Sequence, residues 1–213
     1  MRLSRASLAM TLMVLAASVA YPQASKTHPD RNTPDFTIQV AGDIVTQFNT
    51  RVWTYFELRR ELEKGLPILA VTTDPAETRR AERALVKRIR VARARATQGD
   101  IFTPAIGVEF RKALRRQINA VTWAAIMDDN PGEFQAPING AYPNGKPLST
   151  MPPNILAVLP SLPEDIEYRF VGRHLILLDT RARVILDRIP YAIQCPDSDT
   201  TCRPPLTRNS VVR

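Results

Sequence analysis

The sequence predicts an α+β protein in which an N-terminal antiparallel bundle of three helices is followed by a proline-rich connector and a small three-stranded antiparallel β-meander. Two observations support this. Apolar residues recur at spacings of three and four up to residue 127, as on one face of a helix, whereas beyond Pro163 they alternate with polar residues, as in a strand. Most of the 18 prolines lie after Asp129, so stiff connecting segments are expected between the two patterns.

The first twenty residues have the pattern of a secretory signal peptide. Arg2 and Arg5 precede an apolar run, Leu8–Val19, that is too short to span a bilayer, and small residues lead up to Ala20. We therefore predict a signal peptide over 1–20, cleaved after about Ala20, and a periplasmic or secreted protein. The alternative is a buried or membrane-anchoring helix, and an intact N-terminus in protein sequenced from the cell envelope would favour it.

Residues 21–35 are polar and have no period, which predicts a disordered leader before a helical domain at 36–130. The first helix of that domain is expected to end at Gly65, and Arg59 stands at the one position of its apolar repeat where an apolar residue is expected. The repeat fits a coiled-coil seam in a homodimer or packing against helices of the same chain, and the second is favoured because those helices need cover. The apolar positions are Ala41, Val45, Phe48, Val52, Tyr55 and Leu62.

Residues 74–127 predict two amphipathic helices hinged at Gly99–Pro104 and packed as an antiparallel hairpin. Asp74 is a good N-cap for the first helix, and Thr103 for the second, and each is followed by a proline at the first helical position. The expected apolar stripes are Ala81, Leu85, Ile89, Ala92 and Ala96 in the first helix, and Ile106, Phe110, Leu114, Ile118, Val121 and Ala125 in the second.

Positive charge is concentrated on these helices. The whole chain has a net charge of +8, and between Arg51 and Gln117 there are 16 Lys and Arg residues against 8 Asp and Glu residues. A basic face of the helix after Asp74 could bind a polyanion such as lipopolysaccharide phosphate, nucleic acid or an acidic protein. The favoured alternative is a solvated face, partly neutralised by glutamates of the first helix, because this helix has no aromatic residues to stack on bases. The candidate binding residues are Arg79, Arg80, Arg83, Lys87 and Arg90, and the glutamates are Glu57, Glu61 and Glu63.

The last third of the chain changes character. A turn sequence at Asp128–Gly132 ends the helical domain, and a proline-rich connector with a short helix follows at 131–165. Residues 166–192 predict the meander, with one face to bury against the helices or against a second copy of the protein. A polar tail at 193–213 closes the chain. The expected strands are Ile166–Phe170, His174–Leu178 and Arg183–Ile189.

No stretch has the residue types and spacing of an active site, a metal cage or a nucleotide-binding loop, so no catalytic residue, metal or cofactor is predicted. In an exported protein Cys195 and Cys202 are expected to form a disulfide. A metal site is the alternative, but it would lack two further soft ligands, since the histidines are His28 in the leader and His174.

Four segments of the chain resemble an uncharacterised family of exported bacterial proteins, and the similarity extends over 48–192. The resemblance implies export but no activity. The segment Tyr168–Ile189 is also similar to the C-terminal hairpin of the periplasmic nickel and cobalt homeostasis proteins, although no histidine-rich or cysteine-rich tract accompanies it here. The four segments are Gly99–Pro104, Ile126–Gly132, Pro147–Pro153 and Leu162–Gly172.

Three classes of function are compatible with the sequence. The favoured class is a non-catalytic periplasmic or secreted protein that binds a macromolecular, anionic partner. The first alternative is an envelope hydrolase that uses carboxylates such as Asp128 and Glu133, although two histidines leave little choice of base. The second alternative is a nucleic-acid-binding protein, which export and the lack of stacking aromatics disfavour.

Overall fold

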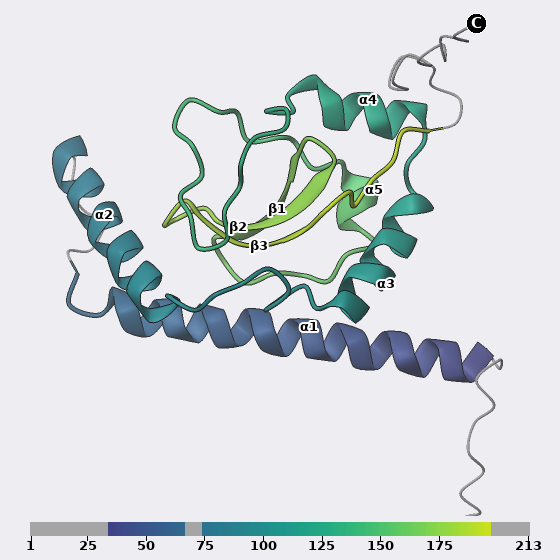
Figure 1. Ribbon diagram of the computed structural model, residues 1–213, viewed down its shortest axis with the longest axis horizontal. Helices are drawn as coiled ribbons and strands as arrows, with labels where there is room; N and C mark the ends of the chain where they lie inside the picture. The colour runs from purple at the N-terminus through teal and green to yellow at the C-terminus, as the bar shows by residue number, and fades with distance from the viewer. Residues whose placement is uncertain (1–33, 67–73, 197–213) are drawn as a thin grey trace, which may run out of the picture.

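The computed structural model describes residues 34–66 and 74–196. It shows an α+β protein in which helices precede a three-stranded antiparallel sheet, as the sequence predicts (Figure 1). The predicted signal peptide and all of the predicted leader before residue 34 lie outside the described residues. Within the described residues, no helix is both long enough and apolar enough to cross a membrane. The helices are α1 (Pro34–Glu63), α2 (Pro75–Ala92), α3 (Pro104–Arg115), α4 (Ala120–Asp128) and α5 (Pro153–Leu156).

The sheet is a simple meander in the order β1-β2-β3. Tyr168 of β1 lies opposite Leu177 of β2, and Leu175 of β2 lies opposite Ile189 of β3. The alternating pattern and the turn at Gly172, whose φ is 56°, are sufficient to specify this arrangement. The three predicted strands are therefore confirmed, and their bounds are Ile166–Val171 for β1, His174–Asp179 for β2 and Val184–Ile189 for β3.

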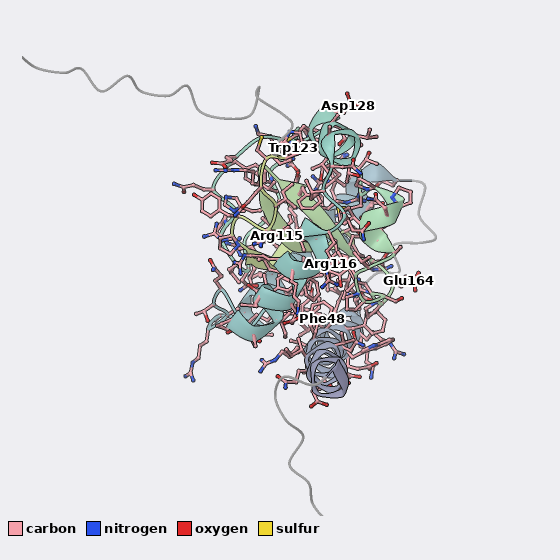
Figure 2. All side chains as sticks on the ribbon, turned by 90° about the vertical axis from the view of Figure 1, so that its right-hand side faces the viewer. Phe48, Arg115, Arg116, Trp123, Asp128 and Glu164 are labelled. Atoms are coloured by element: carbon pink, nitrogen blue, oxygen red, sulfur yellow. The ribbon has the colours of Figure 1, made fainter. Side chains whose placement is uncertain are left out.

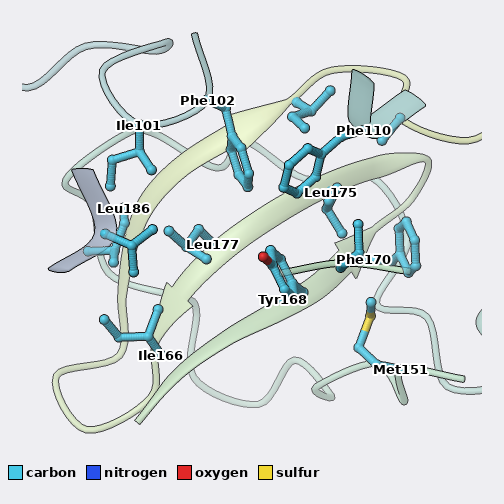
Figure 3. Close-up of a cluster of buried hydrophobic side chains, with 14 of the residues drawn as sticks. Ile101, Phe102, Phe110, Met151, Ile166, Tyr168, Phe170, Leu175, Leu177 and Leu186 are labelled. Atoms are coloured by element: carbon cyan, nitrogen blue, oxygen red, sulfur yellow. The ribbon is translucent and has the colours of Figure 1, made fainter. Parts of the chain in front are cut away.

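Both faces of the sheet are buried, whereas the alternating pattern predicts one buried face. The first face packs against the helices in a single apolar core, of which Figure 3 labels Phe102, Phe110 and Tyr168. The rings of Phe48 and Phe110 lie next to Tyr168, and Phe102 packs on both phenylalanines. The second face is covered by the connector, whose Ala136 and Tyr142 pack on Ile176. A strand buried on both faces needs apolar residues at consecutive positions, and the continuous run Leu175–Leu178 supplies them.

Arg59 interrupts the apolar repeat of α1 because it is part of a buried polar cluster. Its side chain is only 3% exposed and lies 3.5 Å from Asp179 and 3.4 Å from Asp165. Tyr55, one turn earlier, donates a hydrogen bond of 2.5 Å to the same Asp179. Burial, followed by the charge of Asp179, raises the pKa of the Tyr55 hydroxyl. A buried charge is tolerated only when it is paired, so this cluster fixes the position of α1 along the sheet.

The helix α2 ends earlier than predicted. α2 ends at Ala92 and not at Gly99, because the chain turns away to meet β3. There the buried carboxylate of Asp187 accepts hydrogen bonds from the backbone N–H groups of Gly99, Ile101 and Phe102 at 2.7–3.2 Å. These bonds replace the contacts that another helical turn would have made.

The expected second helix of the pair is divided in two. Asn119 caps α4 by accepting a hydrogen bond from the backbone N–H of Thr122 at 2.9 Å, and the chain between α3 and α4 changes direction. The predicted antiparallel hairpin is also not formed. α2 and α3 each pack against α1, at different places along its length (Figure 1). The N-caps Asp74 and Thr103 are where the sequence places them.

The connector is held against the sheet by side-chain and backbone hydrogen bonds. Residues 139–142 run beside β3, with bonds from Asn139 N–H to Ile185 O (2.8 Å), from Ile185 N–H to Gly140 O (2.9 Å) and from Tyr142 N–H to Arg183 O (2.7 Å). Elsewhere three pairs join the residues after α4, the connector, β1 and the turn after β1. These pairs are Asp129 with Thr150, Asn130 with Gly172, and Ser149 with Phe170.

Candidate functional site

A groove of about 940 Å³ lies between α2 and the rest of the molecule. One wall is the face of α2 and the turn after it, from Arg79 to Ala94. The opposite wall is the connector segment 141–144, and the third side is the turn between β2 and β3, residues 181–183. We call this feature the basic groove, because six of its lining residues are cationic and one, Glu82, is acidic. The cations are Arg79, Arg83, Lys87, Arg90, Arg181 and Arg183.

Four of the five candidate binding residues line this groove. Arg79, Arg83 and Lys87 recur every four residues, and Arg90 follows after three, so they share one face of α2. Arg80, the fifth candidate, does not line the groove and lies 3.8 Å from Glu77 on the outer surface of the helix. The helical period therefore separates Arg80 from the other four.

The groove cations of α2 are not neutralised within the described part of the chain. Arg79, Arg83, Lys87 and Arg90 make no side-chain hydrogen bond or ion pair there. The glutamates expected to neutralise them pair with cations outside α2: Glu57 with Arg60 at 3.3 Å, Glu61 with Lys64 at 2.7 Å, and Glu63 with the groove residue Arg181 at 2.9 Å. The expected neutralisation by α1 is therefore absent for the four cations of α2 and present for Arg181. Like charges held together on one wall give a positive potential that attracts anions.

Arg183 was not identified from the sequence, yet it combines three unusual features in the groove. Its φ is 52°, in the left-handed region, which costs a residue with a Cβ roughly 1–2 kcal/mol. Its guanidinium lies over the ring of Tyr142, 5.7 Å from the centroid. Its Nε is buried and has no hydrogen-bond partner among the described residues. Backbone strain of this kind is commonly retained at functional sites.

α2 is fixed by contacts between its C-terminal half and the body of the protein. Leu85 and Ile89 are buried in the main core. Arg88 donates to the carbonyl groups of Leu62 and Lys64 at 2.8 and 2.9 Å, where α1 ends and a cation is favourable. The same end is held by Asn139, whose amide donates to the carbonyl groups of Arg90 and Arg93 at 3.1 and 3.0 Å. The connector, which forms one wall of the groove, therefore positions the helix that forms the other wall.

Arg93 follows the last residue of α2 and faces inward. Its Nη2 donates to Leu186 O at 3.1 Å, and its guanidinium lies 5.2 Å from the centre of the Tyr55 ring. Burial lowers the pKa of Arg93, although the neighbouring Tyr55, Asp100 and Asp187 oppose the shift. This arginine joins α2 to the sheet and does not face the groove.

The carboxylates considered for a hydrolase are both exposed. Asp128 is the last residue of α4, and Glu133 lies in the connector, 3.9 Å from Arg173. Between them, Asp129 accepts hydrogen bonds from the backbone N–H and hydroxyl of Thr150, and the hydroxyl bond lowers the pKa of Asp129. The acidic turn thus holds the connector in place, as a helix terminus would.

His174 and Cys195 are the remaining residues considered for metal binding or a disulfide. His174 Nδ1 accepts a hydrogen bond from the backbone N–H of Tyr191 at 3.0 Å, and partial burial lowers the pKa of the imidazole. Cys202 lies outside the described residues, so its predicted disulfide with Cys195 stays a prediction. Across residues 34–66 and 74–196, no group of three or more His, Cys, Asp or Glu side chains could hold a metal ion.

The segments that suggest an exported bacterial family belong to the scaffold and not to the groove. Three of them are joined by the hydrogen bonds of Asp129, Asn130 and Ser149 described above. The family resemblance stays a prediction. Comparisons of this chain with protein-family models, with curated proteins and with solved structures find no match.

Proposed function

We propose that this protein is a non-catalytic, exported binding protein whose basic groove receives an anionic macromolecular partner. The observation that carries the proposal is the lack of neutralisation on the α2 wall. Four cations share that wall, and no carboxylate of the described residues pairs with them. Keeping like charges together weakens a fold by self-repulsion, so an arrangement of this kind is typical of a surface that binds an opposite charge.

The composition of the cations supports the same conclusion. Five of the six are arginines, whose planar guanidinium forms paired hydrogen bonds with carboxylate or phosphate oxygens. The groove also has apolar lining residues, among them Val86, Val91 and Pro143. Binding sites commonly combine such an apolar surface with a small number of charged groups that fix the orientation of the ligand.

Retention on a heparin column tests this function, with heparin as a general polyanion. The test variant is Arg83→Gln/Lys87→Gln, which removes two charges from the groove. The matched control is Arg115→Gln/Arg116→Gln, which removes the same two charges from the end of α3, on the side of the molecule away from α2 (Figures 1 and 2).

The groove variant should elute at clearly lower salt than the wild type, and the control should elute close to it. Each lost contact with an anion should also reduce the slope of log K against log salt by about 1, so the groove pair should lower the slope by about 2. Equal shifts for the two variants would mean that net charge alone governs retention, and the groove would lose its proposed role.

A further inference from the structure

Resting on the proposed function, we infer that the partner of the basic groove is an acidic peptide segment bound in an extended conformation, with acidic side chains at every second position and apolar side chains between them. The spacing of the groove cations and the difference between the two long walls of the groove support this partner.

The cations of α2 form a regular row. Arg79, Arg83 and Lys87 are separated by four residues each, and Arg90 follows three residues later. A helix rises about 1.5 Å per residue, so neighbouring charges are about 4.5–6 Å apart along the axis and the row is about 16.5 Å long. An extended peptide places every second side chain on one side at intervals of about 6.6 Å. Alternate carboxylates on such a peptide can therefore meet successive cations of the row.

The opposite wall has a different character. Residues 141–144 carry no charge and present Ala141 and Pro143 to the groove. An extended peptide in the groove would direct one set of side chains to α2 and the other set to this wall. The first set should be acidic and the second apolar, because burying a charge against an uncharged wall is costly.

The groove is poorly suited to the bases of a nucleic acid. Tyr142 is the one aromatic residue among its lining residues, and its side chain is only 2% exposed. Its hydroxyl donates to Pro147 O at 2.6 Å, and its ring is covered by the guanidinium of Arg183. Single-stranded nucleic acids are held largely by bases stacked on exposed aromatic rings, and no such ring is available here.

Glu82 provides a test that a purely structural role would not satisfy. It is the acidic residue of the groove lining, it precedes Arg83, and its carboxylate makes no ion pair or hydrogen bond within the described residues. A carboxylate at this place repels an acidic ligand. Glu82→Gln removes the repulsion and should tighten binding about two- to fivefold, the range expected for one exposed charge interaction.

The experiment measures fluorescence anisotropy of a labelled seven-residue peptide, Glu-Val-Glu-Val-Glu-Val-Glu, with the full chain. A peptide of the same composition with its four glutamates in one block and its three valines in another controls for charge. A single-stranded oligonucleotide of equal charge and anionic vesicles of phosphatidylglycerol are the competing ligands.

We expect the alternating peptide to bind at least about fivefold more tightly than the blocked peptide. Arg83→Gln/Lys87→Gln should weaken it by about tenfold, whereas Arg115→Gln/Arg116→Gln should leave it nearly unchanged. Glu82→Gln should strengthen it, a gain that a misfolded variant cannot produce.

Equal binding of the two peptides would overturn the inference, as would tighter groove-dependent binding of the oligonucleotide or the vesicles. Heparin retention that depends on the groove, together with no binding of the alternating peptide, would also overturn it but would leave the proposed anion-binding function intact. Loss of both results would contradict the function itself.

Discussion

Asn139 joins the connector to the end of α2, and replacing it should loosen one wall of the groove without removing any cation. Its amide nitrogen donates to the carbonyl groups of Arg90 and Arg93 at 3.1 and 3.0 Å, and its backbone N–H donates to Ile185 O at 2.8 Å. Its φ is 60°, a conformation that Asp and Gly also tolerate. Substitution by either residue therefore isolates the side-chain contribution.

The magnitude follows from these contacts. Asn139→Gly removes two hydrogen bonds to helix carbonyl groups, each with a net value of about 1 kcal/mol, and should lower the free energy of unfolding by about 1–2 kcal/mol. Asn139→Asp removes the same donors and also places a negative charge beside the carbonyl end of α2, which costs roughly a further 0.5–1 kcal/mol. The aspartate variant should therefore be the less stable of the two.

Urea unfolding followed by circular dichroism measures both values, with the slope m expected to be unchanged. Asn139→Gly should also elute from heparin at lower salt than the wild type, because the cations of α2 are less well held. If Asn139→Asp unfolds within about 0.5 kcal/mol of the wild type and Asn139→Gly elutes with it, the connector does not position the helix and the reasoning is refuted.

Two further predictions concern the scaffold. Asp187→Ala leaves the buried backbone N–H groups of Ile101 and Phe102 without an acceptor, and each such group costs about 1–3 kcal/mol. Urea unfolding should therefore show a loss of roughly 2–6 kcal/mol, and a loss below about 1 kcal/mol would contradict the prediction. The hydroxyl of Tyr168 donates to Pro160 O, and burial raises its pKa above the unfolded value of about 10. The stability that this group contributes is therefore present below about pH 10 and is lost as the pH rises further. Above about pH 10, Tyr168→Phe should therefore make the fall in unfolding free energy with pH shallower by about 1.4 kcal/mol per pH unit; an unchanged slope would show that the hydroxyl titrates freely in the folded protein.

The beginnings of the helices could be predicted from the sequence because they depend on local chemistry. Asp74 and Thr103 satisfy N–H groups within the next few residues, and no distant contact is needed. The end of α2 could not be predicted in this way. It depends on Asp187, which is more than eighty residues away and provides acceptors for the backbone around Gly99.

The break at Asn119 had a local signal, since Asn is a strong N-cap. The apolar stripe that continues through Ile118 and Val121 concealed it. In the structure Val121 is 80% exposed, so the apparent stripe includes a residue that is not part of the core. Periodicity alone therefore joined two helices that point in different directions.

Only the part of the groove that α2 supplies could be predicted from the sequence. The helical period was sufficient to find the cations of α2, because they are local to one element. Arg181 and Arg183 come from a turn about ninety residues later, and the uncharged wall at 141–144 comes from a connector with no regular pattern. Their meeting depends on the backbone pairing of Tyr142 with Arg183, which only the folded chain reveals.

That same pairing has a consequence for solubility. An outer strand of a small sheet offers open N–H and C=O groups, to which a neighbouring molecule can add a strand of its own. On the β3 side, Asn139, Gly140 and Tyr142 already occupy those groups at Ile185 and Arg183, and Ala141 forms an isolated bridge with Val184. At residues 183–185 the edge of the sheet is therefore closed by the protein's own backbone, which protects this part of the edge against strand addition by a neighbouring molecule.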